Sequence, residues 1–177
     1  SRRQRQMCIR DSTQSVTKRI LTSLKRLEYR GYDSAGISAI KNRKIERCRA
    51  AGKLSNLERA LVKQPISGSI GIGHTRWATH GVPSIENAHP HVSGQVAVVH
   101  NGIIENYQQL KEELANDGIT MQTETDTEVV AHLANAYLQA GMQPKDMMQA
   151  LLSKIQGAFA LLIMTVSYTH LTLPTRR

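Results

Sequence analysis

The sequence predicts an α+β fold in which helices and antiparallel strands form separate layers. Apolar residues at helical spacing gather in a few amphipathic segments, and short apolar strand-like runs occur as a hairpin and as neighbouring runs, not in strict strand and helix alternation. At 177 residues with 40% hydrophobic content, the chain is long enough for one globular core and short for two. We therefore expect one domain, or most of one.

The first half of the chain is expected to contain a hairpin between two helices. Apolar side chains at helical spacing predict an amphipathic helix over residues 15–27. Residues 35–40 and 45–50 flank a polar turn and predict a β-hairpin. Ser55 and Glu58 have the spacing of a capping box, which predicts that a second helix begins there. Residues before position 13 show no periodicity, so no element is expected among them.

The second half is expected to contain strands followed by paired helices. Two apolar runs, 69–74 and 95–100, predict strands that each end in a histidine followed by a polar motif. Three helices and a last strand are then expected at 107–116, 127–139, 144–155 and 158–164. Because loops at strand ends are held by a rigid scaffold, the two polar motifs are where chemistry is expected.

The net charge of +9 does not indicate nucleic-acid binding, because of where it lies. The excess of basic residues is confined to residues 1–26 and to the last two positions, and the remainder of the chain is balanced. Aromatic residues, on which bases stack, make up 4% of the chain. We expect no nucleic-acid partner.

Cysteine content and hydropathy indicate a protein of a reducing compartment. The two cysteines, Cys8 and Cys48, cannot build a disulfide framework, and Cys48 is expected to be an inert strand residue. No apolar run approaches the roughly 20 residues needed to span a bilayer. The basic first residues are not followed by the apolar run of a secretory signal. We therefore expect a cytoplasmic protein with no membrane partner.

The most informative stretch is residues 73–81, Gly-His-Thr-Arg-Trp-Ala-Thr-His-Gly. It gathers a guanidinium, an indole, two imidazoles and two hydroxyls between glycines that let the backbone bend. Such a composition is typical of a loop that closes on a small polar ligand. Two further polar signatures follow, His100-Asn101-Gly102 and the stretch 123–128, Thr-Glu-Thr-Asp-Thr-Glu. Together they predict a site for a small amino acid.

These residues also have plainer explanations. Arg76 and Asp126, taken alone, fit an ordinary ion pair, and Asn101-Gly102 alone fits a hairpin turn. His132 lies among apolar helix residues and is expected to pack, not to catalyse.

Several histidines suggest a zinc site as an alternative. Neither cysteine is near them in the sequence, and no glutamate completes a metal-hydrolase motif, so we expect no metal and no other cofactor. The histidines in question are His74, His80, His89 and His91.

Five segments, taken in chain order, carry a family resemblance: 27–36, 73–81, 87–91, 99–106 and 123–128. They resemble the glutaminase domain of class II glutamine amidotransferases over roughly residues 13–165. The residues of these motifs are most similar to those of the hexosamine-forming members, the glutamine–fructose-6-phosphate aminotransferases. The resemblance implies an N-terminal-nucleophile hydrolase fold, a four-layer αββα sandwich that is here incomplete at both ends.

The resemblance also implies a reaction. In this family an N-terminal cysteine attacks the side-chain amide of glutamine, its own α-amino group serves as base, and the ammonia passes to a separate sugar-phosphate domain. The roles implied for this chain are Arg76 on the glutamine α-carboxylate, Asp126 on the α-ammonium, Asn101 and the Gly102 N–H as the oxyanion hole, Thr79 and His80 lining the closing loop, and Trp77 capping the site.

The chain departs from the family at the nucleophile. Cys8 is preceded by seven residues and followed by Ile9 and Arg10, where the family has a cysteine at its N-terminus followed by glycine. Cys8 is therefore a poor match, and we expect the chain alone to be inactive. Residues 1–12 and 166–177 are expected to be a non-native leader and tail around a partial glutaminase domain, residues 13–165.

The whole protein is expected to hydrolyse glutamine to glutamate and ammonia and to use the ammonia to convert fructose 6-phosphate to glucosamine 6-phosphate. Its partners would then be glutamine and fructose 6-phosphate, and it is expected to be a homo-oligomer. Two alternatives remain open: a non-catalytic glutamine-binding module, and another class II amidotransferase.

Overall fold

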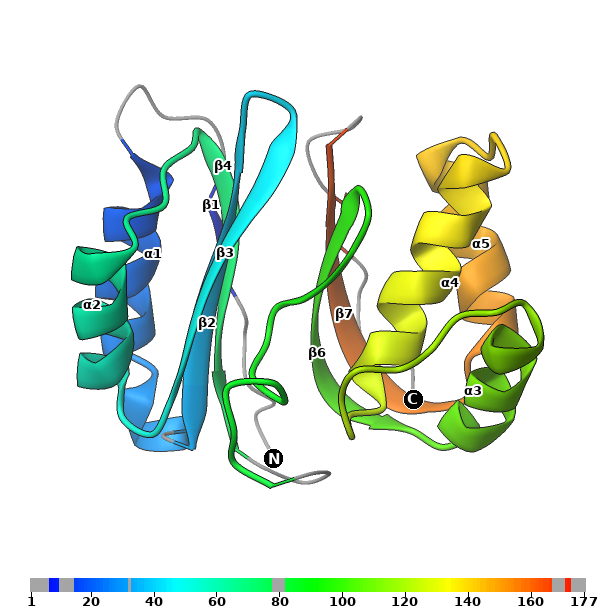
Figure 1. Cartoon of the computed structure of the whole chain (residues 1–177), viewed down its shortest axis with the longest axis horizontal. Helices are drawn as coiled ribbons and strands as arrows, with labels where there is room; N and C mark the ends of the chain where they lie inside the picture. The colour runs from blue at the N-terminus through cyan, green and yellow to red at the C-terminus, as the bar shows by residue number, and fades with distance from the viewer. Residues whose placement is uncertain (1–6, 10–14, 32, 78–81, 167–170, 173–177) are drawn as a thin grey trace. The chain divides into compact units, whose positions relative to one another are not determined.

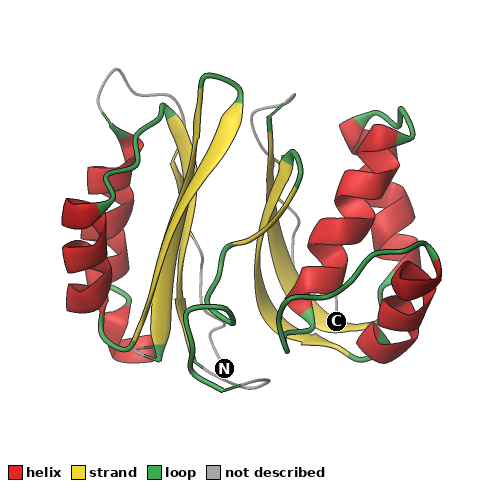
Figure 2. Ribbon diagram, viewed as in Figure 1, coloured by secondary structure: helices red, strands yellow, loops and turns green. Residues whose placement is uncertain are grey.

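The computed structural model describes residues 7–9, 15–31, 33–77, 82–166 and 171–172. The chain divides into two compact units, Ser1–Pro90 and His91–Arg177. Each unit contains one antiparallel sheet with helices packed on it (Figures 1 and 2).

The first unit has a four-stranded sheet in the order β1-β4-β2-β3, with every neighbouring pair antiparallel. Two amphipathic helices, α1 and α2, lie on one of its faces (Figure 2). Its elements are β1 (Met7–Ile9), α1 (Val16–Lys25), a 3-10 helix (Glu28–Arg30), β2 (Ser34–Lys41), β3 (Lys44–Ala51), α2 (Leu54–Lys63) and β4 (Ile70–Arg76).

Glycines on β4 let helix α1 approach the sheet closely. A Cβ added at Gly73 would overlap the side chain of Ile20 and lie 3.2 Å from Leu24. Alternate strand residues, among them Ala35 and Ile37, enter the core beneath the helices. The intervening residues therefore point to the other face of this sheet.

The second unit has a sheet in the order β5-β6-β7-β8, again antiparallel throughout. Three helices cover it, and their apolar faces share one core with the sheet (Figure 1). Its elements are β5 (His91–Ser93), β6 (Val96–Ile104), α3 (Tyr107–Asn116), α4 (Thr127–Gln139), α5 (Pro144–Lys154), β7 (Gly157–Thr165) and β8 (Leu171–Thr172).

The α+β prediction is confirmed, and three of its details are wrong. The capping box is one, because α2 begins at Leu54 and its first N–H donates to the distant Glu28 carboxylate at 2.9 Å. The strand ends are another, because β6 continues through Asn101 and Gly102 to Ile104 and β4 continues past His74 to Arg76. The third is β1, which pairs with β4 where no element is expected. Among the described residues, no helix has the length and apolar character to cross a membrane.

Candidate functional site

The polar end of β6 carries Asn101 and Gly102. The strand is buried from Val96 to His100, whereas Asn101 is half-buried and Gly102 is exposed. Both residues lie inside the strand and pair with β7, so the hairpin-turn interpretation is wrong. The strand therefore presents an amide side chain and a peptide group at an accessible position.

Gly102 is required at its position by its backbone. Its φ of +124° lies in a region that other residues rarely adopt. An added Cβ would overlap the carbonyl oxygen of Ala158 and lie 2.8 Å from the Cα of Phe159 on β7. No side chain fits between Gly102 and β7.

Asp126 is joined to the same end of β6. Its carboxylate Oδ2 accepts a hydrogen bond from the backbone N–H of Ile104 at 2.9 Å, two residues beyond Gly102. Asp126 is 5% exposed, and the Thr127 hydroxyl donates to its Oδ1 at 3.4 Å. The structure thus brings these three predicted site residues together: Asn101 and Gly102 lie at the end of β6, and Asp126 is bonded to the backbone of that strand end.

His100 belongs to this cluster, although sequence reasoning gave it no role. Its Nδ1 is hydrogen-bonded to the Thr127 hydroxyl at 3.0 Å and lies 3.7 Å from Oδ1 of Asp126. The ring is buried, so the carboxylate has an imidazole and a backbone N–H as near neighbours. Its place in the His100-Asn101-Gly102 signature, directly before Asn101, is the signal that could have found it.

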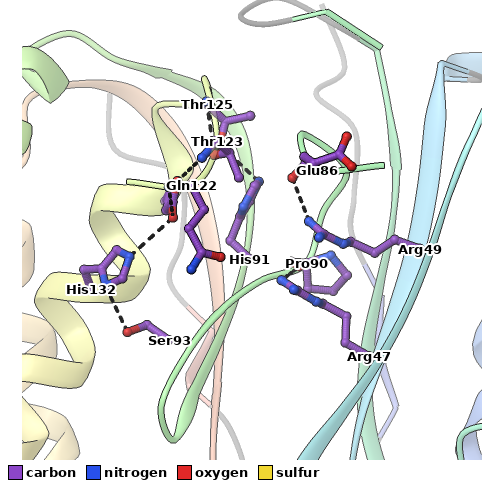
Figure 3. Close-up of polar contacts among 11 residues, drawn as sticks. Arg47, Arg49, Glu86, Pro90, His91, Ser93, Gln122, Thr123, Thr125 and His132 are labelled. Atoms are coloured by element: carbon purple, nitrogen blue, oxygen red, sulfur yellow. Dashed lines mark hydrogen bonds and ion pairs between the residues drawn. The ribbon is translucent and has the colours of Figure 1, made fainter. Parts of the chain in front are cut away.

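Glu128 holds the turn that leads into helix α4. Its carboxylate accepts hydrogen bonds from the backbone N–H of Gln122 at 2.9 Å and of Thr123 at 2.7 Å (Figure 3). Burial raises the pKa of this carboxyl, but hydrogen bonds from His132 and from the two backbone groups outweigh that effect and lower the pKa to about 2. The charged carboxylate therefore fixes the turn that precedes Asp126.

Ser93, His132 and Glu128 are joined in the order of a hydrolase triad. The Ser93 hydroxyl is bonded to Nδ1 of His132 at 3.1 Å, and Nε2 of His132 lies 3.4 Å from the Glu128 carboxylate (Figure 3). The carboxylate already accepts two backbone N–H groups and is a weak base with a pKa of about 2. The cluster joins β5 to α4 through its side chains. That His132 packs and does not catalyse stays a prediction.

Arg76 and Trp77 lie at the end of β4 in the first unit. Arg76 is the last residue of the strand and is 5% exposed, with its carbonyl oxygen accepting the N–H of Asp33 at 3.2 Å. Trp77 follows it and is 56% exposed. The predicted site residues Thr79 and His80 lie outside the described residues.

Cys8 lies in β1, where its backbone pairs with Ile72 of β4. Its side chain is outside the described part of the structure. Cys48 is buried in β3, and burial raises the pKa of its thiol, as expected for an inert strand cysteine.

The histidines proposed as zinc ligands have other neighbours. The ring centroids of His74 and His89 lie 4.5 Å apart. Nε2 of His91 is bonded to the Thr125 hydroxyl at 3.1 Å. In the described ranges, which omit His80, no three His, Cys, Asp or Glu side chains are grouped so that they could hold a metal ion.

Two arginines of β3 bind the segment that follows the polar loop. Arg49 donates to the carbonyl oxygen of Glu86 at 2.7 Å, and Arg47 donates to that of Pro90 at 3.3 Å (Figure 3). Arg49 also donates to the carbonyl oxygen of Ala88 at 2.9 Å. Neither arginine is marked in the sequence, because a strand arginine gives no sign of a distant backbone partner.

Comparison with known proteins identifies a family. A sequence profile described as "Glutamine amidotransferase domain" matches residues 74–175. The chain is 52% identical over 163 residues to a protein of Zymomonas mobilis named glutamine–fructose-6-phosphate aminotransferase (isomerizing), covering 92% of this chain and 27% of that protein. A Bradyrhizobium diazoefficiens protein of the same name is 58% identical over 146 residues, 82% of this chain and 24% of its own length. The chain thus spans about a quarter of the length of these curated relatives.

Solved structures give a consistent result. Glutamine phosphoribosylpyrophosphate amidotransferase from B. subtilis, complexed with ADP and GMP, matches with a TM-score of 0.74 and 32% identity, over 90% of this chain and 34% of that one. A structure described as the allosteric regulatory enzyme of purine biosynthesis matches with a TM-score of 0.70 and 36% identity, over 82% of this chain and 32% of that one.

Proposed function

Because the chain belongs to the glutamine amidotransferase domain family, we propose that it binds glutamine as the ammonia donor of a larger enzyme. Its fold class is the expected one, that of the N-terminal-nucleophile amidotransferases, with two antiparallel sheets and helices. In the proposed reaction a cysteine sulfur bonds to the side-chain amide carbon, the C–N bond breaks and ammonia leaves. Water then cleaves the thioester and releases glutamate.

The observation that carries this proposal is the accessible end of β6. Asn101 and Gly102 emerge from a buried strand, and the Asp126 carboxylate is bonded to the backbone two residues further on. An amide N–H and a peptide N–H held by a rigid strand suit the negative oxygen of a tetrahedral intermediate, and donors of this kind are each worth about 10²- to 10³-fold in rate in related chemistry.

Substrate recognition is assigned to charged residues. We propose that Arg76 binds the α-carboxylate of glutamine, since a guanidinium forks onto a carboxylate through two charge-assisted bonds. Asp126 is proposed to bind the α-ammonium group, and Trp77, Thr79 and His80 to close over the amide. The exposure of Trp77 supports the capping role.

We propose that this chain does not turn glutamine over, because Cys8 has its α-amine in a peptide bond and no glycine after it. Incubation with glutamine, followed by assay of glutamate and ammonia, tests this directly. Turnover that Cys8→Ala abolishes would overturn the proposal for the nucleophile and leave the binding proposal intact.

Calorimetric titration with glutamine tests the binding proposal. The chain is first shown to unfold cooperatively in urea, so that absence of binding cannot reflect absence of folding. Binding that falls about tenfold or more in Asp126→Asn and in Arg76→Lys, and is unchanged in the surface variant Glu112→Gln, supports it. A folded chain that releases no heat with glutamine at millimolar concentration overturns it.

For the whole protein, we propose that the ammonia aminates fructose 6-phosphate to give glucosamine 6-phosphate. The support is the name of the relatives at 52% and 58% identity. The solved amidotransferase named for phosphoribosylpyrophosphate is less similar, at 32% identity, which disfavours a nucleotide precursor as the acceptor. A homo-oligomeric whole protein and a cytoplasmic location stay predictions.

A further inference from the structure

Three residues form a row across the sheet of the first unit. Gly36 of β2 pairs with Arg49 of β3 on one side and with His74 of β4 on the other. The neighbours of Gly36 along β2, Ala35 and Ile37, are buried in the core with the helices. Because strand residues alternate between faces, the row lies on the face away from α1 and α2.

The Arg49 end of this row holds a distant backbone segment. Its Nη1 donates to the carbonyl oxygen of Glu86 at 2.7 Å (Figure 3). The same Nη1 donates to the carbonyl oxygen of Ala88 at 2.9 Å. One cationic group thus satisfies two peptide oxygens that are two residues apart, and hydrogen bonds from a charged donor are stronger than neutral ones.

The other two residues of the row, Gly36 and His74, lie against the same segment. At Gly36, an added Cβ would overlap the carbonyl oxygen of His89 and lie 2.9 Å from Cγ of Arg49, so the backbone at His89 lies directly against β2. At the third position, the ring of His89 lies 4.5 Å from that of His74.

The segment is also tied to itself. The side chain of Asn87 donates to the carbonyl oxygen of Val82 at 3.0 Å, and the backbone N–H of Asn87 donates to the Ser84 hydroxyl at 3.2 Å. These bonds join residues 82–87 to one another and do not attach them to the sheet. The bonds from Arg49 attach the segment to the sheet of the first unit.

We propose that Arg49 is a positioning residue, which holds residues 86–88 on the sheet so that His89 packs against His74 beside Arg76. His74 and Arg76 are two residues apart on β4 and therefore share a face of the strand. Displacing the segment removes the packing next to Arg76. This inference rests on the proposed function in one respect, that Arg76 binds glutamine.

Four single variants of the full chain test the proposal. Arg49→Met removes the two bonds and keeps most of the side-chain length, and Arg49→Lys keeps a charged N–H donor on a shorter side chain. Gly36→Ala obstructs the segment at His89 while the chain keeps the Arg49 guanidinium. Arg59→Met is the matched control, because that guanidinium donates to Asn56 within helix α2 at 2.6 Å.

Hydrogen exchange measured by mass spectrometry on the segment 84–90 is the first readout. We expect about tenfold faster exchange in Arg49→Met and Gly36→Ala than in Arg59→Met, a smaller increase in Arg49→Lys, and unchanged exchange in helix α1. Exchange in Arg49→Met and Gly36→Ala equal to that of the control overturns the proposal. If Arg49→Met loses cooperative unfolding, Arg49→Lys and Gly36→Ala supply the test.

Glutamine affinity is the second readout. We expect the Kd to rise about fivefold or more in Arg49→Met and to recover in part in Arg49→Lys, with Arg59→Met unchanged. An unchanged Kd together with faster exchange overturns the link to Arg76. A wild-type chain that does not bind glutamine overturns the proposed function, while the exchange data still decide whether Arg49 seats the segment.

Discussion

Glu128→Gln is the variant that most directly tests how the turn before Asp126 is held. The carboxylate accepts the backbone N–H groups of Gln122 and Thr123, and its pKa is lowered from an ordinary 4.5 to about 2. At about 1.4 kcal/mol per pKa unit, the ionised form contributes about 3 kcal/mol to stability at neutral pH. The amide of glutamine keeps one acceptor and places an NH₂ group where the second acceptor was, so we expect a loss of about 2 to 3 kcal/mol.

The pH dependence separates this mechanism from a general loss of packing. A carboxyl whose pKa is lowered by folding contributes fully above pH 4.5, and the contribution is lost as the pH falls towards 2. The difference in unfolding free energy between wild type and Glu128→Gln should therefore shrink by more than half between pH 7 and pH 3. Urea unfolding followed by circular dichroism measures it, and Glu112→Gln on the exposed face of α3 is the control. A difference that stays constant with pH would show that Glu128 does not stabilise the turn through its ionised form.

Three further predictions concern single residues. Gly102→Ala should destabilise the chain by about 3 kcal/mol or more in urea unfolding, because φ is positive and Ala158 occupies the space; a loss below about 1 kcal/mol would contradict this. Ser38→Ala should leave the melting temperature unchanged or raise it, because the Ser38 hydroxyl is buried and has no hydrogen-bond partner among the described residues; a clear drop would show that the hydroxyl is satisfied. In a Cys8→Ala background, Cys48 should react with a thiol reagent at the rate of unfolding, because its thiol is buried with a raised pKa; rapid reaction of the folded chain would contradict this.

Much of the fold followed from local patterns. Helices α3 and α4 begin and end at the predicted residues, because their apolar spacing and flanking polar residues are local signals. The start of α2 could not be predicted in this way, since the group that caps it is Glu28, far away in the sequence. The same limit explains β6, whose continuation through Asn101 depends on pairing with β7.

For the candidate site, the sequence by itself determined which residue types are present and the family to which they belong. The tertiary structure alone decided how those residues are held. Asp126 is bonded to the backbone of β6, Glu128 to the turn before it, and Arg49 to carbonyl oxygens about 40 residues further along the chain. The physical reason is that a backbone N–H or carbonyl has the same chemistry at every residue, so no sequence motif marks which one a charged side chain will bind; only the folded chain brings the two together.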